Sequence, residues 1–560
     1  MLRETLTAMR DLPRMKEISG VLIRHGLGEF AERLRLPRAV EIAGEWLHLK
    51  KADAAEATPT PVRVRQALEE LGPTFIKLGQ ILSTRVDVFA PHWIAEFEKL
   101  QNEVPPIDAA QLPALLQSAL GAAPETLFAS FDAEPIGSAS IAQVHRAVLK
   151  EGGAVAVKLR RPGIVDKVQA DLRILSYLAG ALELEFPDAR RFQPQEIVRQ
   201  FTRSMTREMD LAAEARNMER FARDFADDAH VTVPGVHWAY TNAMVNVQDF
   251  VEGVPGSRLD LLAAEGIDPA DMARYGADAV LKMILINGFF HADPHPGNVI
   301  FQPGPRIAFV DFGMVGRLSH ARRDEIVDLL AALVLHDERG MMDVLIEWTG
   351  SKQIDEAQFA TDIGELVFAY EHVPLKNIRI SQLIGEMMEL IRNHSILLPA
   401  DLAMLFKALI TLEGLGRQLD PDFLLIEHLT PFVRRLVAER HHPANLIKRG
   451  RHTLTETLGM LSSLPHDMAR LGKDMRQGKF SVNLDLRRLD SFAHQLDRSA
   501  NRLTMGIVTG ALIIGSSIVM TVNAGPRLFG LPFLGLFGFL IATINGLWLI
   551  ASIWRSGKRA

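Results

Sequence analysis

The sequence His291-Ala-Asp-Pro-His-Pro-Gly-Asn298, with Asp311-Phe-Gly313 after it, decides the fold class of this 560-residue chain. Asn298 lies five positions after Asp293, and Asp311 lies 18 positions after it. This is the kinase arrangement for phosphoryl transfer, in which one carboxylate faces the nucleophile while an amide and a second carboxylate bind Mg²⁺. The sequence therefore predicts an enzyme that uses ATP and Mg²⁺, with Asp293 as the base or metal-side carboxylate and Asn298 and Asp311 as metal ligands.

The residues on either side of this loop predict rigid support for it. Leu281–Phe290 follows an apolar helical pattern, and Arg306–Val310 is typical of a short buried strand. Within the loop, Pro294 and Pro296 restrict the backbone, and Gly297 permits close approach to phosphate. We expect a stiff loop between two core elements; the simpler alternative is a Pro/Gly turn with a few polar residues.

A kinase also needs a lysine on an earlier strand, and Ala154-Val-Ala-Val-Lys158 supplies one. The apolar alternation predicts a strand, and Lys158 at its end would contact the α- and β-phosphates of ATP. Many strands end in lysine for solubility, so this motif alone is weak. Its position 135 residues before Asp293 favours a two-lobed, protein-kinase-like α+β fold, with a β-rich lobe before a helical lobe.

The segment before the lysine strand differs from a glycine-rich phosphate loop. It reads Pro135-Ile-Gly-Ser-Ala-Ser-Ile-Ala-Gln-Val-His145, in which only one residue is glycine. The side chains that follow this glycine narrow the backbone conformations and hold the loop farther from a nucleotide. We predict an ATP pocket with altered phosphate geometry, formed in this segment by Gly137, Ser138, Ala139, Ser140 and Val144.

These motifs together resemble the UbiB family of atypical, kinase-like proteins. The resemblance rests on the small-residue loop, the lysine strand, Glu208-Met-Asp210 continuing to Glu214-Ala-Arg-Asn217, and the HADPHPGN and DFG motifs, all in the family's order. It also rests on Lys77-Leu-Gly-Gln80, which is similar to the family's KxGQ signature and has no counterpart in ordinary protein kinases. The similarity extends from about residue 60 to about residue 420.

The KxGQ segment itself predicts a helix. Its apolar residues follow a 3,4 spacing that places Lys77 and Gln80 together on another face. From the residues alone, a solvated helix face is the alternative. The resemblance implies that this helix packs over the active site, where a protein substrate would otherwise bind. Lys77 would then contact either the phosphate region or the Glu208/Asp210 pair, so Lys77 and Glu208 join Asp293 as catalytic candidates.

The acidic residues of Glu208-Met-Asp210 and Glu214 lie in one predicted helix, over about residues 195–225. Two helical residues six positions apart differ by about 240° around the axis, so the two glutamates should have different partners. By analogy with a kinase regulatory helix, we pair Glu214 with Lys158, which leaves the Glu208-Met-Asp210 acids for Lys77. The exchanged pairing is also open.

The chain after the DFG motif departs from protein kinases. Residues 324–334 already follow a helical pattern, and neither an APE sequence nor a long activation segment precedes them. This leaves little room for a peptide-docking platform. The sequence favours ATP hydrolysis or phosphorylation of a small acceptor over a conventional protein kinase.

Two uncharged apolar stretches, 503–522 and 528–553, contain 20 and 26 residues. Each is long enough to cross a hydrocarbon core of about 30 Å, which predicts a C-terminal transmembrane helical hairpin, although a buried soluble pair is the alternative. Positive charges flank the hairpin on its outer ends, which places the kinase-like domain on the cytoplasmic side of the inner membrane. Residues 441–502 contain 11 Lys and Arg against 6 Asp and Glu, a net charge of +5 that would attract anionic lipids. Gly506 and Gly510 would permit close helix packing or a homodimer.

Composition adds few limits. The net charge of −6 argues against a nucleic-acid partner, and the lack of cysteine excludes disulfides and thiolate metal sites. The predicted order of segments is an N-terminal helical segment (1–60), the KxGQ helical extension (61–130), the N-lobe (131–255), the C-lobe (256–440), a basic juxtamembrane linker (441–502) and the hairpin (503–553).

The family resemblance implies support of ubiquinone biosynthesis, with polyprenyl-phenol or quinone precursors as ligands and biosynthetic enzymes as partners. A true kinase acting on a protein or small molecule, and a nucleotide-gated scaffold, are the alternatives.

Overall fold

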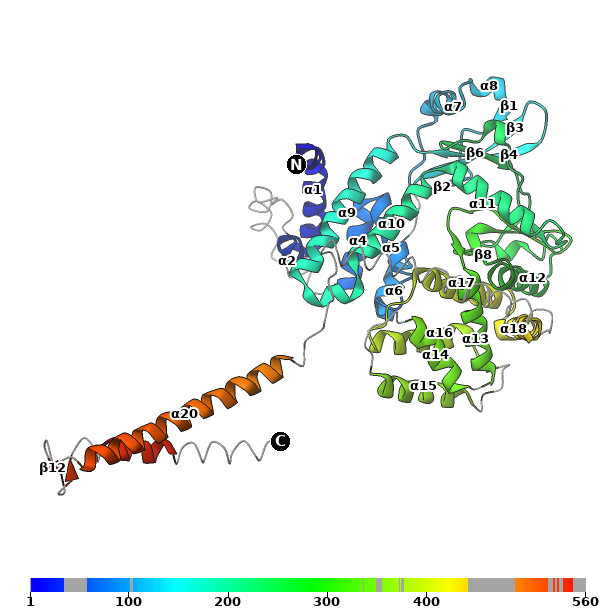
Figure 1. The fold of residues 1–560 in the computed structure, drawn as a ribbon. Helices are drawn as coiled ribbons and strands as arrows, with labels where there is room; N and C mark the ends of the chain where they lie inside the picture. Colours follow the sequence, from blue (N-terminus) through cyan, green and yellow to red (C-terminus); the bar gives the residue numbers. More distant parts are fainter. Residues whose placement is uncertain are drawn as a thin grey trace, which may run out of the picture. The chain divides into compact units, whose positions relative to one another are not determined.

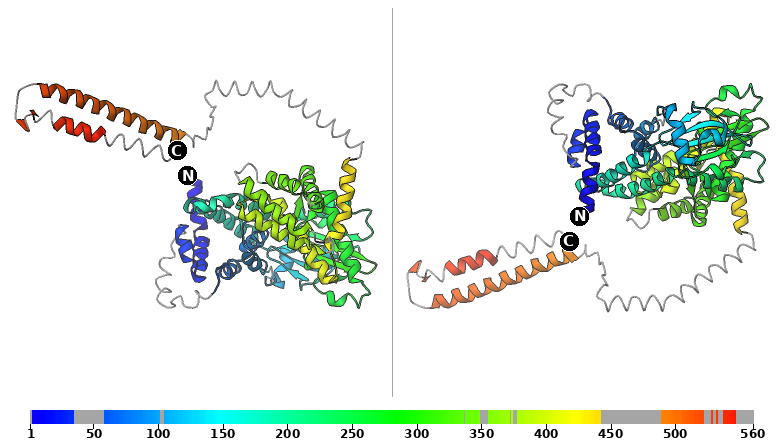
Figure 2. Two further views of the ribbon diagram at one scale, coloured as in Figure 1. Left: turned by 90° about the horizontal axis from the view of Figure 1, so that it is seen from below. Right: turned by 90° about the horizontal axis from the view of Figure 1, so that it is seen from above.

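A computed structural model describes residues 2–34, 58–100, 104–335, 337–348, 355–371, 373, 377–441, 489–521, 527–528, 531–532 and 537–546. The chain forms two compact units, Met1–Leu446 and Ile447–Ala560. In the first unit a small β-rich lobe lies beside a larger helical lobe, and a further body of helices lies next to both (Figure 1, Figure 2).

The N-lobe is built around a five-stranded antiparallel sheet with the strand order β1-β3-β4-β6, to which β2 is added on β3. The strands are β1 Phe128–Phe131, β2 Gly137–Ser138, β3 Ala142–Leu149, β4 Ala154–Arg160 and β6 Val245–Asp249. Alternate residues of β4, including Val155 and Val157, pack in a core with the helix α7, Leu112–Leu120. Because side chains alternate along a strand, Lys158 points to the opposite face, beside Val144 of the neighbouring β3.

The helical body joins the N-terminal helices to a long helical hairpin of the N-lobe. Its helices are α1 Leu2–Arg24, α2 Gly28–Arg33, α4 Thr60–Leu71, α5 Pro73–Leu82, α6 Pro91–Phe97, α9 Ile164–Glu185 and α10 Pro194–Glu208. One hydrophobic cluster runs through all of these except α2. Buried Asp171 of α9 accepts hydrogen bonds from the Thr74 hydroxyl at 2.6 Å and from Arg14 at 2.7 Å, so it ties α5 and α1 to α9. The predicted KxGQ helix is thus α5, held on several sides.

The prediction of a single helix over residues 195–225 is wrong, because two helices cover this range. α10 ends at Glu208, and a new helix, α11 Leu211–Asp224, begins after two residues. Asp210 caps α11, because its Oδ1 accepts the backbone N–H of Ala212 at 3.1 Å, and its other oxygen contacts Arg216 at 2.9 Å. A short acidic side chain at this position satisfies the free N–H groups of the next helix, which favours the break.

The C-lobe combines two small sheets with helices. Its strands are β5 Val231–Thr232, β7 Val254–Pro255, β8 Phe289–His291, β9 Val299–Gln302, β10 Arg306–Phe309 and β11 Val315–Arg317. Its helices are α12 Pro269–Leu281, α13 His320–Leu335, α14 Glu338–Trp348, α15 Glu356–Glu371, α16 Ile380–Asn393, α17 Ala400–Leu419 and α18 Leu425–His441. Strand β10 confirms the predicted strand before the DFG motif, and α13 begins nine residues after Asp311, which confirms the short segment there.

The helix expected over Leu281–Phe290 is wrong only in its last three residues. After α12, a π-helical turn covers Lys282–Asn287, and Gly288 then leads the chain into β8 with a φ of 61°. A Cβ at Gly288 would lie 2.9 Å from the Leu318 carbonyl oxygen, so both the backbone angle and the space favour glycine. The loop that follows is therefore supported by a strand pair, since β8 pairs with β11.

The second unit contains α20, Leu489–Thr521, the strands β12 Arg527–Leu528 and β13 Leu531–Pro532, and helical residues 537–546. Within it, the buried side chains are small: Thr509, Ser516 and Ala542. In the described part of the chain, no helix combines the length and apolar character needed to cross a bilayer. This finding does not support the predicted transmembrane hairpin; residues 522–526, 529–530, 533–536 and 547–553 of the hairpin lie outside the described residues. Residues 442–488 of the predicted juxtamembrane linker also lie outside them.

Candidate nucleotide site

A cavity of about 1090 Å³ lies between the two lobes of the first unit. This volume is at the upper end of the range of small-molecule sites, so it has room for a nucleotide and part of a second ligand. Eight of the predicted site residues line it: Gly137, Ser138, Ala139, Val144, Lys158, Asp293, Asn298 and Asp311. The other four, Ser140, Lys77, Glu208 and Glu214, are not among its lining residues.

Lys158 connects the N-lobe helix α11 with the DFG motif. Its Nζ lies 2.7 Å from Glu214 Oε1 and 3.6 Å from Asp311 Oδ1. Burial acts to lower the pKa of Lys158, but the Asp311 and Glu214 carboxylates raise it above its ordinary value. Burial alone would raise the pKa of Asp311, yet Lys158 and the Gly313 N–H hold it well below its ordinary value. The predicted Lys158–Glu214 pair is confirmed, and Asp311 is ionised at neutral pH.

Lys77 reaches the end of α10 from α5. Its Nζ lies 2.7 Å from Glu208 Oε1, which confirms the predicted pair. Burial acts to lower the pKa of Lys77, but Glu208 raises it above its ordinary value. The predicted share of Asp210 in this pair is wrong, because Asp210 caps α11. Gln80 donates to the Leu100 carbonyl at 3.1 Å and lines the cavity.

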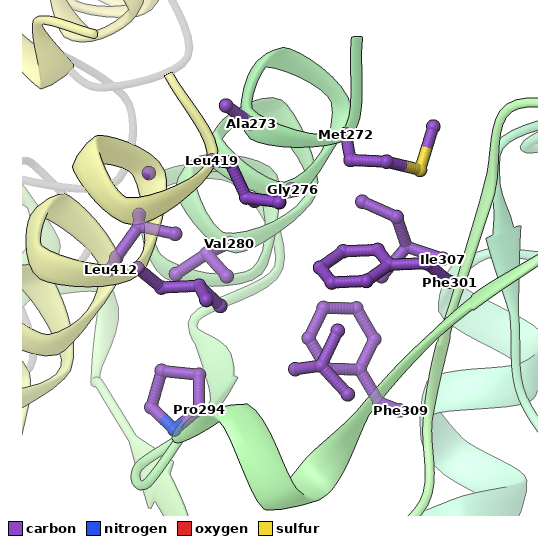
Figure 3. A pocket seen from close by; sticks show the side chains of 13 residues that line it. Met272, Ala273, Gly276, Val280, Pro294, Phe301, Ile307, Phe309, Leu412 and Leu419 are labelled. Carbon is purple, nitrogen blue, oxygen red and sulfur yellow. The ribbon is translucent and has the colours of Figure 1, made fainter. Parts of the chain in front are cut away.

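The loop 291–298 is held by its own side chains. The Asp293 N–H donates to His291 Nδ1 at 3.1 Å, and the Asn298 amide donates to the Asp293 carbonyl at 3.2 Å. Pro294 lies at the edge of a small apolar pocket of about 20 Å³ between α12 and α17, near Val280 and Leu412 (Figure 3). This pocket is too small for a ligand, and its apolar walls anchor the loop from behind.

The small-residue loop is fixed by a side chain that sequence reasoning missed. Arg161 donates to the Ser138 hydroxyl at 2.7 Å and to the Ala139 carbonyl at 2.8 Å. The same hydroxyl donates to the Val104 carbonyl at 2.8 Å. Ser138 is therefore occupied by protein partners, and Ser140 is buried. The only sequence signal was the position of Arg161 just after the lysine strand.

The metal ligands fit Mg²⁺ that arrives with a nucleotide. Among the described residues, no group of three or more His, Cys, Asp or Glu side chains could hold a metal ion. Mg²⁺ is commonly bound by one or two protein oxygens together with substrate phosphates and water. Asn298 and Asp311, which both line the cavity, provide such a pair of oxygens. When bound, the ion would neutralise charge that develops on the phosphates.

Lys407 and Glu98 are two of five charged cavity residues that were not predicted; the others are Arg146, Asp249 and Glu252. Lys407 of α17 places its Nζ 3.6 Å from Asp293 Oδ1. Glu98 also lines the cavity. Burial raises the pKa of its carboxyl, and the charge of Lys407 opposes this shift. No motif in the sequence marks either residue.

Comparison with known proteins places the chain in a family. The ABC1 atypical kinase-like domain matches residues 99–345, the UbiB helical domain matches residues 363–424, and the ABC1/UbiB kinase-like C-terminal domain matches residues 487–555. The chain belongs to the ABC1/UbiB family of atypical kinase-like proteins. Membership confirms the family resemblance and the kinase-like α+β fold that the motifs predicted.

One curated protein and one solved structure are similar to this chain. The uncharacterized protein in the hydrogenase 1 5' region of Clostridium pasteurianum is 33% identical over 504 residues, covering 89% of this chain and 94% of that protein. In the solved complex of Rv3197 with erythromycin from Mycobacterium tuberculosis, the matching chain is 23% identical, with a TM-score of 0.46. The match covers 70% of this chain and 97% of that one.

Proposed function

We propose that this chain is an Mg²⁺-dependent, kinase-like ATPase that supports ubiquinone biosynthesis and acts on polyprenyl-phenol lipid intermediates. The use of ATP is supported by one observation: the four residues of the kinase-like motifs line the same cavity. These residues are Lys158, Asp293, Asn298 and Asp311. The lipid substrate and the ubiquinone role follow from resemblance to the UbiB family.

Each cavity residue has a role that its surroundings support. Lys158 is held by Glu214 and would contact the α- and β-phosphates. Asn298 and Asp311 would hold Mg²⁺, for which an ionised Asp311 is required. Asp293, whose backbone is fixed by its own loop, would accept the proton of water or of an acceptor hydroxyl.

The helix α5 supports a small acceptor rather than a folded protein. Gln80 and Ser83, at the C-terminal end of this segment, line the same cavity as the catalytic loop. The buried Lys77–Glu208 pair holds the helix there, and removing either charge would leave the other without its partner. A folded protein substrate would have to displace this helix, whereas a phenol head group would not.

Association with the inner, cytoplasmic membrane is supported by the surface of the second unit. Ile507, Ile514 and Ile518 of α20 are 65%, 64% and 60% exposed, while small residues such as Ser516 and Ala542 are buried. Small residues inside and large apolar residues outside are typical of helices that pack in lipid. We propose that anionic lipids and lipid precursors meet the protein here. Flotation with phosphatidylglycerol vesicles should carry the full chain and leave behind a chain that ends at residue 495.

ADP release by the purified full-length chain tests the proposed activity. We expect Mg²⁺-dependent ADP release that rises with anionic vesicles containing a polyprenyl-phenol, and that falls by at least about a hundredfold in Asp311→Asn. Tight ATP binding without ADP release under all of these conditions would contradict an ATPase and would instead fit a nucleotide-gated scaffold. A phosphorylated phenol in the products would identify the acceptor as the lipid rather than water.

A further inference from the structure

The carboxylate of Asp293 has a cationic neighbour from a distant part of the chain. Lys407 Nζ lies 3.6 Å from Asp293 Oδ1, and both side chains line the cavity. A charged hydrogen bond between nitrogen and oxygen is usually about 2.7–2.9 Å long. At the longer distance the ammonium group is attracted by the carboxylate but keeps its three N–H donors available for a further ligand.

A rigid helix carries Lys407. Its neighbours Leu405, Phe406 and Ala408 are buried in the C-lobe core, so the backbone of α17 is held in place. Thr411, one turn later on the same side of the helix, also lines the cavity. The Lys407 side chain is 22% exposed, so its charge is partly withdrawn from water. A cation in this setting needs little reorganisation to act on charge that develops in a reaction.

The site needs a cation at this position. Phosphoryl transfer spreads negative charge over the oxygens of the transferred group, which fixed cations stabilise. The loop 291–298, which carries Asp293, contains no Lys or Arg. Three such side chains line the cavity among the described residues; Arg146 and Lys158 project from the N-lobe sheet, and Lys407 comes from the C-lobe. Lys407 is therefore the cation on the side where the nucleophile would approach.

We propose that Lys407 binds the γ-phosphoryl group of ATP during transfer and is a catalytic residue of this chain. The inference rests on the proposed ATP turnover. In that step the bond from Pγ to the bridging oxygen breaks and its electron pair leaves with ADP. The new P–O bond forms to water or to an acceptor hydroxyl, whose proton passes to Asp293. Lys407 donates to a non-bridging oxygen of the group in transit and offsets its negative charge.

Nucleotide titrations of the full-length chain separate this role from a structural one. We would measure the Mg²⁺-dependent affinities for β,γ-imido ATP and for ADP in the wild type, Lys407→Met and Lys407→Arg. Lys150→Met is the matched control, since Lys150 is exposed at the turn between β3 and β4. Because ADP has no γ-phosphate, we expect Lys407→Met to weaken the ATP analogue by about tenfold or more and ADP by less than about twofold. Lys407→Arg should retain most of the affinity, and ADP release by Lys407→Met should fall by about a hundredfold.

Three outcomes would overturn the proposal. Equal weakening of both nucleotides would mean that Lys407 shapes the cavity as a whole, and unchanged affinity for both would mean that it does not touch the phosphate. Lys407→Gln replaces the methionine variant if thermal unfolding shows that the latter does not fold. Failure of the wild type to bind the ATP analogue would remove the proposed function as well, whereas normal wild-type binding with unaffected variants removes only the role of Lys407.

Discussion

Gly256 lies against the backbone of the catalytic loop, and Gly256→Ala should disturb the metal site without removing a polar side chain. Gly256 is buried, and its N–H donates to the Val299 carbonyl at 2.8 Å, so this backbone cannot move away freely. A Cβ there would lie 2.7 Å from the Pro296 carbonyl oxygen and 3.2 Å from the Pro296 Cα. Both atoms belong to the main chain of the loop, which cannot rotate aside as a side chain could.

The size of the disturbance follows from these distances. Ordinary contact begins at 3.4 Å, so the loop must shift by 3.4 − 2.7 = 0.7 Å. Overpacking of this kind costs about 1–3 kcal/mol of stability. Because a misplacement of about 1 Å in an active site can cost about a hundredfold in rate, we expect kcat/KM for ATP to fall by about ten- to fiftyfold. Asn298 follows Pro296 by two residues, so more Mg²⁺ should be needed for half-maximal activity.

Steady-state ADP release at several Mg²⁺ concentrations, together with thermal unfolding, measures both effects. Gly385→Ala is the control, because Gly385 is exposed on α16 and an added Cβ would meet nothing within 4 Å. That variant should be as active as the wild type and slightly more stable, since alanine favours a helix. A Gly256→Ala enzyme with kcat/KM within twofold of the wild type and an unchanged Mg²⁺ requirement would refute the reasoning.

Three further predictions test the charges around the site by urea unfolding of the full-length chain. Lys77→Met leaves Glu208 without its partner, so it should lower the urea midpoint by the equivalent of about 3–5 kcal/mol. The double variant Lys77→Met, Glu208→Gln should recover part of this loss. Additive losses in the double variant would contradict a direct pair. Asp87→Ala removes the acceptor of the Leu398 N–H, 3.0 Å away, and the ion-pair partner of buried Arg85, 2.6 Å away. It should therefore cost about 3–5 kcal/mol and expose the preceding turn to proteases; unchanged proteolysis would be evidence against these links. Burial raises the pKa of Glu214 to about 7, above its unfolded value of 4.5, so the protonated carboxyl favours the folded state and stability should fall as pH rises from 4.5 to 7. In metal-free protein, Glu214→Gln should remove on the order of 2–3 kcal/mol of this fall, and parallel pH profiles of the two proteins would rule out the assignment.

Contacts could be predicted from the sequence where the residues lie close together in the chain, or where they lie in elements that all kinase-like folds share. Asp293, Asn298 and Asp311 line one cavity because they lie on one strand-supported loop and at the end of the neighbouring β10. The Lys158–Glu214 pair followed from the order of the kinase elements. Spacing along the chain is enough in these cases, because the chain between the residues is short or its path is common to kinase folds.

Residues whose role depends on tertiary packing could not be predicted in this way. Asp210 was interpreted as a partner of Lys77, although an Asp before Leu-Ala-Ala-Glu is equally a helix N-cap, and local hydrogen bonding decided the outcome. Lys407 lies 114 residues after Asp293, and the packing of α17 against α12 and β11 brings the two together. One sequence contains no periodicity or spacing that reports such a contact.

The links around the KxGQ helix restrict how the site can open. On one side, Lys77 of α5 is paired with Glu208 at the end of α10, just before the N-lobe helix α11. On the other side, the turn after α5 is fixed to the C-lobe, where Asp87 accepts the Leu398 N–H at 3.0 Å and Arg392 donates to the Val86 carbonyl at 2.9 Å. Separation of the lobes would have to break one of these buried sets, and a buried charge without its partner is costly. In the proposed reaction, the acceptor would therefore have to be a group small enough to reach Asp293 past α5 while both links stay intact.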